Sequence, residues 1–207
     1  MNKMKLFSAI FAVMCMVACS SNQSKNSEQK TADSSTATAG GEWTRIEPVE
    51  LGNAIQLISK GKMALAAGDK NEMNAMVVTQ GSIGYLWHRP VVTVYVSSGR
   101  YTHGLLEKND YFTLSSFAPE EMSKLMYLGT HSGRDENKIE NSGVHTEFTE
   151  LGNPTFEEAT LTIECKKIYA EPFIKEKLDS TALQMYSDGT EVHTMFIGEI
   201  VNVWSRK

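Results

Sequence analysis

Two short segments of the chain combine residue types that bind anions. The first, SSGRYT at 97–102, follows the apolar run VVTVYV at 91–96 and contains no acidic residue. Gly99 allows backbone amides to turn toward one point, and a helix beginning near Thr102 would add unpaired N–H groups. Arg100 can grip a phosphate through two parallel hydrogen bonds. A helix cap beside an exposed arginine is the simpler explanation of this segment taken alone.

The second segment, GTHSGRDENK at 129–138, again places a glycine turn, hydroxyls and cations at the start of a predicted helix. An anion bound at the first segment could also be contacted by this one. The alternative is a self-contained cap with an ion pair between Asp135 and Lys138, and exposed pairs of that kind contribute little to stability. The two segments identify a site only if the fold brings them together.

The elements that would position these segments are mostly strands. The stretch 75–79 is rich in β-forming residues, and we expect Gly81 and Gly84 to break it. The run 91–96 is apolar on both faces, which is typical of a strand covered on both sides. Two further strands are predicted at 159–169 and 195–204, and one at 111–117.

Helices are fewer and shorter. The spacing predicts one at 102–108, and a second begins at Pro119, which is followed by two glutamates and an apolar stripe through Leu125 and Leu128. The stretch 54–65 fits either a helix or a strand. Because strands outnumber helices, the pattern favours a mainly β chain, an antiparallel barrel with short helical insertions, over a doubly wound sheet.

The first residues predict export from a bacterial cell. Residues 1–18 have a positive start and an apolar run too short to span a membrane, and Met16-Val17-Ala18-Cys19 resembles a lipoprotein cleavage motif. Lipidation of Cys19 would anchor the protein to a membrane of the cell envelope, facing the periplasm or the exterior. The alternative is an ordinary secretory signal. Residues 19–44 are expected to form a lipidated linker, which leaves 45–207 as one domain.

Charge and cysteine content exclude some functions. The chain has a net charge of −5, made more negative by loss of the signal, and no basic stripe, so we expect no nucleic-acid partner. After cleavage and lipidation Cys165 is the only thiol left, so no intramolecular disulfide can form; we expect a buried, inert side chain there. His88, His103 and His145 show no metal-ligand spacing, so no metal site is predicted.

Four blocks of sequence carry a resemblance to a known family. They are NAMVVTQGSIGYLWHRPVVTVYVSSGRYTHGLLEKNDYFTLS at 74–115, SGRDENK at 132–138, FEEATLTIECKKIYA at 156–170 and HTMFIGEIV at 193–201. Their serial order resembles the flavin reductase-like family, the FMN-binding split-barrel proteins that include flavoredoxin. The likeness covers nearly all of residues 45–207.

The resemblance implies a homodimer with FMN held near the subunit interface. Ten residues are carried over as cofactor-binding: Asn74, Met76 and Thr79 beside the isoalloxazine ring, and Ser98, Arg100, Tyr101, Thr102, Ser132, Gly133 and Lys138 around the phosphate and ribityl chain. His193 is a candidate to face the flavin, or else a half-exposed strand histidine. Gln80 and His131 depart from the family pattern, which has an apolar ring neighbour and a lysine there.

The same resemblance implies an oxidoreductase that passes hydride or electrons from NAD(P)H through FMN to an unidentified acceptor. The chain has no GxGxxG fingerprint, so a nicotinamide would bind transiently over the ring. Export conflicts with a pyridine-nucleotide donor and makes a membrane electron carrier the other candidate. The alternative function is a non-catalytic lipoprotein that holds flavin, or another planar phosphorylated ligand, without turnover.

Overall fold

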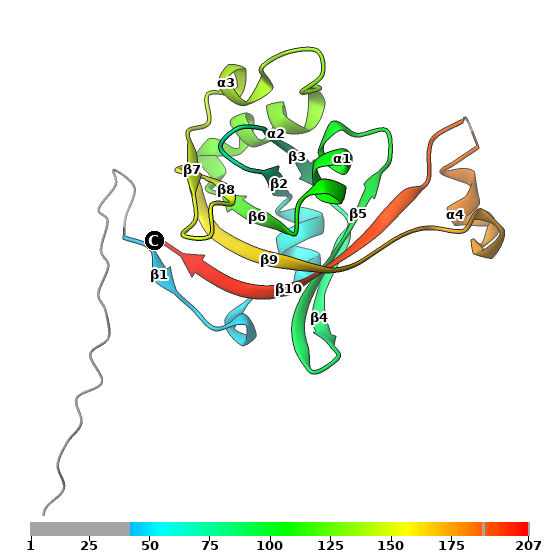
Figure 1. The fold of residues 1–207 in the computed structure, drawn as a ribbon, viewed down its shortest axis with the longest axis horizontal. Helices are drawn as coiled ribbons and strands as arrows, with labels where there is room; N and C mark the ends of the chain where they lie inside the picture. The colour runs from blue at the N-terminus through cyan, green and yellow to red at the C-terminus, as the bar shows by residue number, and fades with distance from the viewer. Residues whose placement is uncertain (1–41, 188, 207) are drawn as a thin grey trace, which may run out of the picture. The chain divides into compact units, whose positions relative to one another are not determined.

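The main element of the fold is a curved antiparallel sheet. The computed structural model describes residues 42–187 and 189–206 (Figure 1). Seven strands follow the order β3-β2-β6-β9-β10-β5-β4, with β1 paired to β10, and β7 and β8 form a separate hairpin. The strands are β1 (Thr44–Arg45), β2 (Met63–Gly68), β3 (Met73–Val78), β4 (Gly81–Leu86), β5 (Arg89–Ser97), β6 (Tyr111–Phe117), β7 (Thr146–Phe148), β8 (Pro154–Phe156), β9 (Ala159–Pro172) and β10 (His193–Ser205).

Short helices lie between the strands, as the sequence predicts. The α-helices are α1 (Tyr101–Lys108), α2 (Met122–Thr130), α3 (Lys138–Ser142) and α4 (Ser180–Gln184), with 3₁₀ turns at Pro48–Glu50, Pro119–Glu121 and Lys175–Lys177. The ambiguous stretch 54–65 contains both kinds of element, a π-helix at Ile55–Lys60 followed by the start of β2. Within the described residues no helix is long and apolar enough to cross a membrane.

The strands β2, β5 and β6 are buried on both faces over most of their length, which explains why they read as apolar runs. In β2 the side chains alternate: Met63 and Leu65 belong to the barrel core, whereas Ala64 and Ala66 belong to a second cluster. The small alanines let α2 pack closely, with Leu125 and Leu128 in that second cluster. This packing holds α2, and therefore the loop after it, against β2 and β3.

Cys165 lies in the barrel core, as expected for an inert hydrophobe. Burial, and then the charge of Glu164, raise the pKa of its thiol far above the ordinary range. The predicted signal peptide, the lipidated Cys19 and the linker up to residue 41 lie outside the described residues and stay predictions.

The strand predicted at 75–79 does end before Gly81, since β3 ends at Val78, but the interpretation of Gly81 and Gly84 as strand breakers is wrong. Both lie inside β4, which pairs with β5 in a hairpin whose turn, Trp87-His88, has φ values of 49° and 61°. Gly81 is required by close packing, because a Cβ there would lie 2.6 Å from the Thr93 carbonyl oxygen. A glycine in a strand can mark a close approach of backbones instead of a break.

Between β9 and β10 the chain leaves the sheet in an excursion, residues 173–192, that we call the arm (Figure 1). It contains α4. At its base the Phe173 ring contacts Tyr95 of β5 with 5.5 Å between centroids, and the Phe173 N–H donates to the His193 carbonyl. The arm therefore returns to the sheet beside the end of β5, where the first anion-binding segment begins.

Candidate functional site

The first segment forms the junction between β5 and α1. Arg100 is the N-cap residue of α1 and has an extended backbone, with φ −78° and ψ 139°, but its side chain makes no capping hydrogen bond. The N-terminal N–H groups of α1 are thus not satisfied by a cap side chain, and the helix end has a positive dipole. Arg100 is also exposed, so this segment taken alone agrees with the simpler explanation, a helix terminus beside an exposed arginine.

The second segment forms the loop between α2 and α3, and the fold places it against the first. Gly133 lies so close to β3 and α1 that a Cβ there would be 2.4 Å from Asn74 Oδ1 and 3.0 Å from the Tyr101 ring. The Asn74 side-chain amide in turn donates to Thr102 Oγ1 at 2.8 Å. Glycine is therefore required at 133 for the two segments to meet.

Together they enclose a cavity of about 80 Å³. Eight of the ten residues that the sequence predicts as cofactor-binding line it: Asn74, Met76, Arg100, Tyr101, Thr102, Ser132, Gly133 and Lys138. Since about 10–15 Å³ of such space holds one water molecule, the cavity holds a group of a few heavy atoms and not a three-ring molecule. A wider cleft of about 600 Å³ adjoins it, sharing Asn74, Tyr101, Gly133, Arg134 and Lys138.

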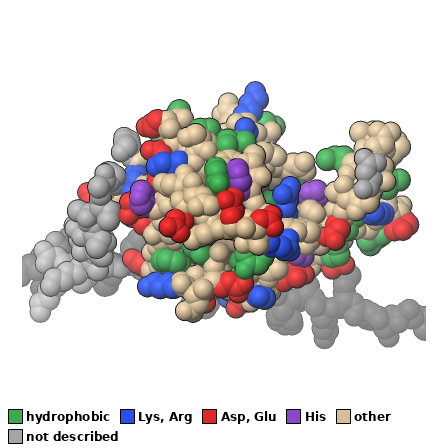
Figure 2. Space-filling view, turned by 90° about the horizontal axis from the view of Figure 1, so that it is seen from above, with side chains coloured by type: hydrophobic (Ala, Val, Ile, Leu, Met, Phe, Trp, Pro, Cys, Tyr) green, Lys and Arg blue, Asp and Glu red, His purple; other side chains and the backbone are tan. Residues whose placement is uncertain are grey.

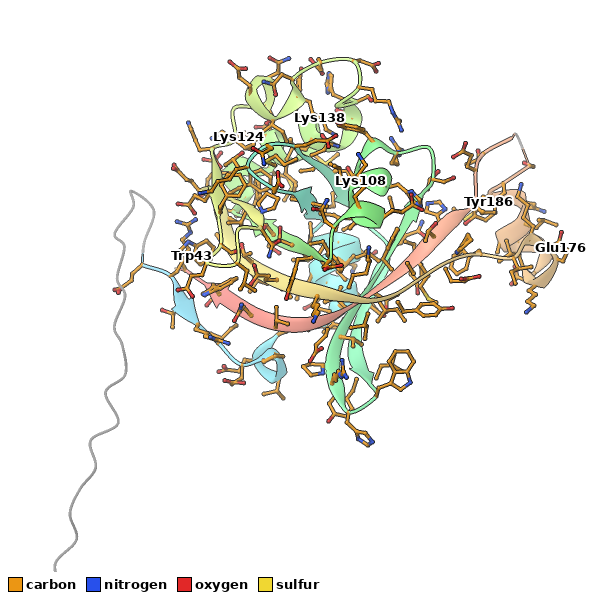
Figure 3. All side chains as sticks on the ribbon, in the orientation of Figure 1. Trp43, Lys108, Lys124, Lys138, Glu176 and Tyr186 are labelled. Carbon is orange, nitrogen blue, oxygen red and sulfur yellow. The ribbon has the colours of Figure 1, made fainter. Side chains whose placement is uncertain are left out.

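Two cations, Arg100 and Lys138, line this cavity and form no ion pair with a described residue, although the charge of Glu136 acts on Lys138. The guanidinium of Arg100 makes no hydrogen bond or ion pair with any described residue. Lys138, labelled in Figure 3, is buried, with 4 % of its surface exposed. Burial first, then the charge of Arg100, lower its pKa to about 8. Two like charges held together in this way favour the binding of an anion.

Lys138 has a structural role as well. Its Nζ donates to the carbonyls of Leu128 at 2.8 Å and His131 at 3.0 Å, which lie at the C-terminal end of α2. The alternative ion pair with Asp135 is not found among the described residues; α3 is capped instead by Asn137, whose side chain accepts from the Glu140 N–H. An ammonium group has three N–H donors, so one is left for a ligand.

Arg134 is a site residue that the sequence reasoning missed. Its guanidinium donates to the Gly99 carbonyl and lies over the Tyr101 ring, 5.7 Å from the centroid, so it connects the two segments across the cavity. Its position inside the SGRDENK block could have identified it, because Ser132, Gly133 and Lys138 of the same block are predicted as cofactor-binding residues.

Two predicted residues do not line the cavity. Thr79 is exposed beyond the end of β3. Ser98 turns away and its hydroxyl donates to the carboxylate of Glu191, on the arm. The segment 97–102 has no acid of its own, but the fold brings Glu191 to Ser98 and Glu72 to the Tyr101 hydroxyl, at 2.8 Å. These acids were not predicted, because both come from distant parts of the chain.

His193 lies beside the site and not in the cavity lining. Its Nδ1 is 2.9 Å from the Tyr186 hydroxyl of the arm, and burial, followed by the charge of Arg100, lowers the pKa of its ring. His131, which departs from the family pattern, stacks on Tyr127 with 3.7 Å between centroids. Gln80, the other departure, is exposed.

The wider surface does not explain anion binding. Figure 2 shows acidic and basic side chains interspersed over one face of the domain. Any selectivity for an anion therefore comes from the local group around Arg100 and Lys138. In the part of the chain that the structure describes, no three His, Cys, Asp or Glu residues are placed to hold a metal ion.

Comparison with protein families gives one match. Residues 56–207 match the model of the flavin reductase like domain. No curated protein sequence matches the chain.

Solved structures with the same fold include three of different origin. An FMN-binding domain of a flavin reductase-like enzyme from Shewanella baltica is 19 % identical, with a TM-score of 0.59 over 82 % of this chain and 80 % of that one. A flavoredoxin from Methanosarcina acetivorans is 23 % identical, with 0.57 over 71 % and 69 %. An NADH:FAD oxidoreductase from Streptomyces globisporus is 18 % identical, with 0.53 over 71 % and 75 %. The predicted antiparallel split barrel with short helices is confirmed.

Proposed function

The chain belongs to the flavin reductase-like domain family, and from this premise we propose that it is an FMN-binding flavoprotein oxidoreductase. The observation that carries the proposal is the position of Arg100 and Lys138, two cations that form no ion pair with a described residue, at one cavity beside the N-terminus of α1. A phosphate monoester, with nearly two negative charges at neutral pH, is the ligand group that this arrangement fits best.

The residues present fit FMN in size as well as in charge. The cavity accommodates the phosphate, and the larger isoalloxazine ring would lie outside it, along β3, where Asn74 and Met76 reach the cavity edge. Arg100 would donate two parallel hydrogen bonds to the phosphate, and Lys138 its remaining N–H. Gly133 would contribute indirectly, because its lack of a side chain lets the two segments meet around the phosphate.

When bound, FMN supplies a redox centre at its N5, which accepts hydride or electrons from a donor and passes them on. The protein binds the phosphate through Arg100 and Lys138 and orients the ring against β3. His193, whose lowered pKa keeps its ring neutral near pH 7, contributes a hydrogen-bonding group without a second positive charge.

The direct test is a titration of the purified protein with FMN, followed by flavin fluorescence and absorbance. We expect flavin bands that survive dialysis; protein that stays colourless and binds no FMN would contradict the proposal. The loaded protein is then mixed without oxygen with NAD(P)H and with quinols. Bleaching of the flavin band identifies the donor, whereas no bleaching by any donor favours the non-catalytic binding lipoprotein.

Glu191 is expected to weaken FMN binding. Its carboxylate lies 3.3 Å from the position of a Cβ on Gly99, close to the phosphate site, so it repels a dianion. Glu191→Gln should tighten FMN binding by roughly 3- to 10-fold at low salt, and by less at high salt because the repulsion is screened. Glu176→Gln, on the same arm but in the 3₁₀ turn at Lys175–Lys177, is the matched control (Figure 3). Weaker binding by Glu191→Gln would show that Glu191 supports the site.

FMN binding should take up a proton at mildly alkaline pH. In the ligand-free protein the pKa of Lys138 is about 8, and a bound phosphate dianion raises it. Between pH 8 and 9 binding therefore requires protonation of Lys138, and affinity falls as pH rises. Calorimetry in buffers of different ionisation enthalpy measures the uptake, with exposed Lys108→Gln as control. A binding enthalpy independent of buffer would contradict the assignment.

We also propose that the protein is a homodimer anchored to the cell envelope by lipid on Cys19. Light scattering of the purified protein tests the first statement. Metabolic labelling with a fatty acid, compared between the wild type and Cys19→Ser, tests the second.

A further inference from the structure

The arm brings a buried tyrosine to the histidine at the start of β10. Tyr186, labelled in Figure 3, follows α4. It is 8 % exposed, although most described residues of the arm are exposed. Its hydroxyl lies 2.9 Å from His193 Nδ1, and the two rings meet edge to face at 5.7 Å and 64°. The side chain is thus held by packing as well as by the hydrogen bond.

This contact assigns the proton of the histidine ring. A buried tyrosine O–H requires an acceptor, and His193 Nδ1 is the partner that it has among the described residues. A ring nitrogen that carries its own hydrogen cannot accept. We therefore assign Nδ1 as unprotonated and place the proton of the neutral ring on Nε2.

The charged groups around His193 support a neutral ring. Burial and the neighbouring Arg100 charge lower its pKa, and Glu191, the nearby acid, is hydrogen-bonded to Ser98. Neither Nε2 of His193 nor the guanidinium of Arg100 has a hydrogen-bond partner in the described ranges 42–187 and 189–206. His193 pairs with Ser97, whose carbonyl accepts from the Arg100 N–H, so these two donors without acceptors belong to neighbouring backbone beside the cavity.

We propose that Tyr186 is a positioning residue: it holds His193 as the Nε2–H tautomer, so that His193 and Arg100 donate together to an oxygen of the bound flavin nucleotide. The statement that His193 and Arg100 donate to the flavin nucleotide, the ligand half of this inference, rests on the proposed function. The statement that Tyr186 fixes the Nε2–H tautomer, the tautomer half, does not. The arm is otherwise an exposed excursion from the sheet, and this contact of Tyr186 with His193 gives it a role at the site.

The tautomer is measured in the ligand-free protein by long-range ¹H–¹⁵N correlation of the histidine rings. The His193 signal is identified by its loss in His193→Gln. We expect a bare Nδ1 and a protonated Nε2 at pH 7 in the wild type. Tyr186→Phe removes the donor that favours the neutral ring, so the pKa of His193 should rise and both tautomers should appear. Tyr169→Phe, on β9, should change neither. A wild-type ring protonated at Nδ1 overturns the proposal.

The role toward the ligand is measured by FMN titration of the same variants. Tyr186→Phe should weaken binding roughly 3- to 10-fold. The side-chain amide nitrogen of glutamine can reach the position of Nε2, whereas that of asparagine reaches only the position of Nδ1. His193→Gln should therefore bind FMN within about 2-fold of the wild type, and His193→Asn should bind as weakly as His193→Ala.

Equal binding by the Gln, Asn and Ala variants overturns the ligand half, because Nε2 would then have no role in binding. If the wild type shows the expected tautomer but binds no FMN, the proposed function fails while the positioning of His193 by Tyr186 stands. If FMN binds but the tautomer differs, the inference fails and the proposed function stands.

Discussion

Arg100→Ala should raise the dissociation constant for FMN about 10- to 100-fold with almost no loss of folding stability. A charge-assisted hydrogen bond contributes about 1.5–3 kcal/mol, and the Arg100 side chain makes none to the described residues in the free protein. The Arg100 side chain can therefore use all of its hydrogen-bonding capacity to bind FMN, and its loss should affect binding and not folding. The removal of Arg100 also relieves its repulsion of Lys138, so the pKa of Lys138 rises and part of the loss is offset.

The matched control is Arg89→Ala, at the other end of β5, where the guanidinium pairs with Glu199 at 3.0 Å. That variant should bind FMN like the wild type. Arg100→Lys keeps the charge but not the two parallel donors, so intermediate affinity is expected. If Arg100→Ala instead lost folding stability and kept its affinity for FMN, Arg100 would be a structural residue and the phosphate site would lie elsewhere.

The sequence was sufficient to predict strands such as β5 and β6 because most of their residues are buried on both faces, whereas the more exposed β4 was not predicted. The run 91–96 is apolar at every position except Thr93, and it lies in β5 between β4 and β10. Gly81 and Gly84 misled the prediction because a glycine in a turn and a glycine at a close backbone contact look the same in sequence. The contact at Gly81 is with Thr93, which only the pairing of β4 with β5 brings near.

The meeting of the two anion-binding segments was implied by the family resemblance and not by local pattern. Gly133 and Asn74 are far apart in the chain, and their contact depends on how α2 packs on β2 and β3. Composition could not predict that Lys138 would donate to the Leu128 and His131 carbonyls, because backbone acceptors leave no sequence signature.

The acidic residues near the site also could not be predicted from sequence, because they reach it from distant parts of the chain. Ser98 and Glu191 are 93 residues apart, and only the return of the arm to β10 joins them. Tyr186 reaches His193 by the same route. Residues on the arm had no motif to identify them, so their contacts with the site could be found only in the structure.

Gly198→Ala should destabilise the barrel by about 3 kcal/mol. A Cβ at Gly198 of β10 would lie 2.6 Å from Phe112 Cζ and 2.7 Å from Cys165 Cβ, both in the fully buried core. Overpacking of a well-packed core costs about 1–3 kcal/mol and occasionally more, and these neighbours lie on the central strands β6 and β9, which have little room to move. For a domain of this size the change lowers the melting temperature by about 6–12 °C.

Gly84→Ala is the matched control, because it also lies in a strand but has nothing within 4 Å of the added Cβ. Its stability should change by less than about 0.5 kcal/mol. A double variant, Gly198→Ala with Phe112→Leu, separates steric crowding from other causes: relief of the contact makes the double variant more stable than the sum of the single changes predicts. Additive losses would show that Gly198 is needed for backbone conformation at the register shift between Ile197 and Gly198, and not for the space that Phe112 occupies.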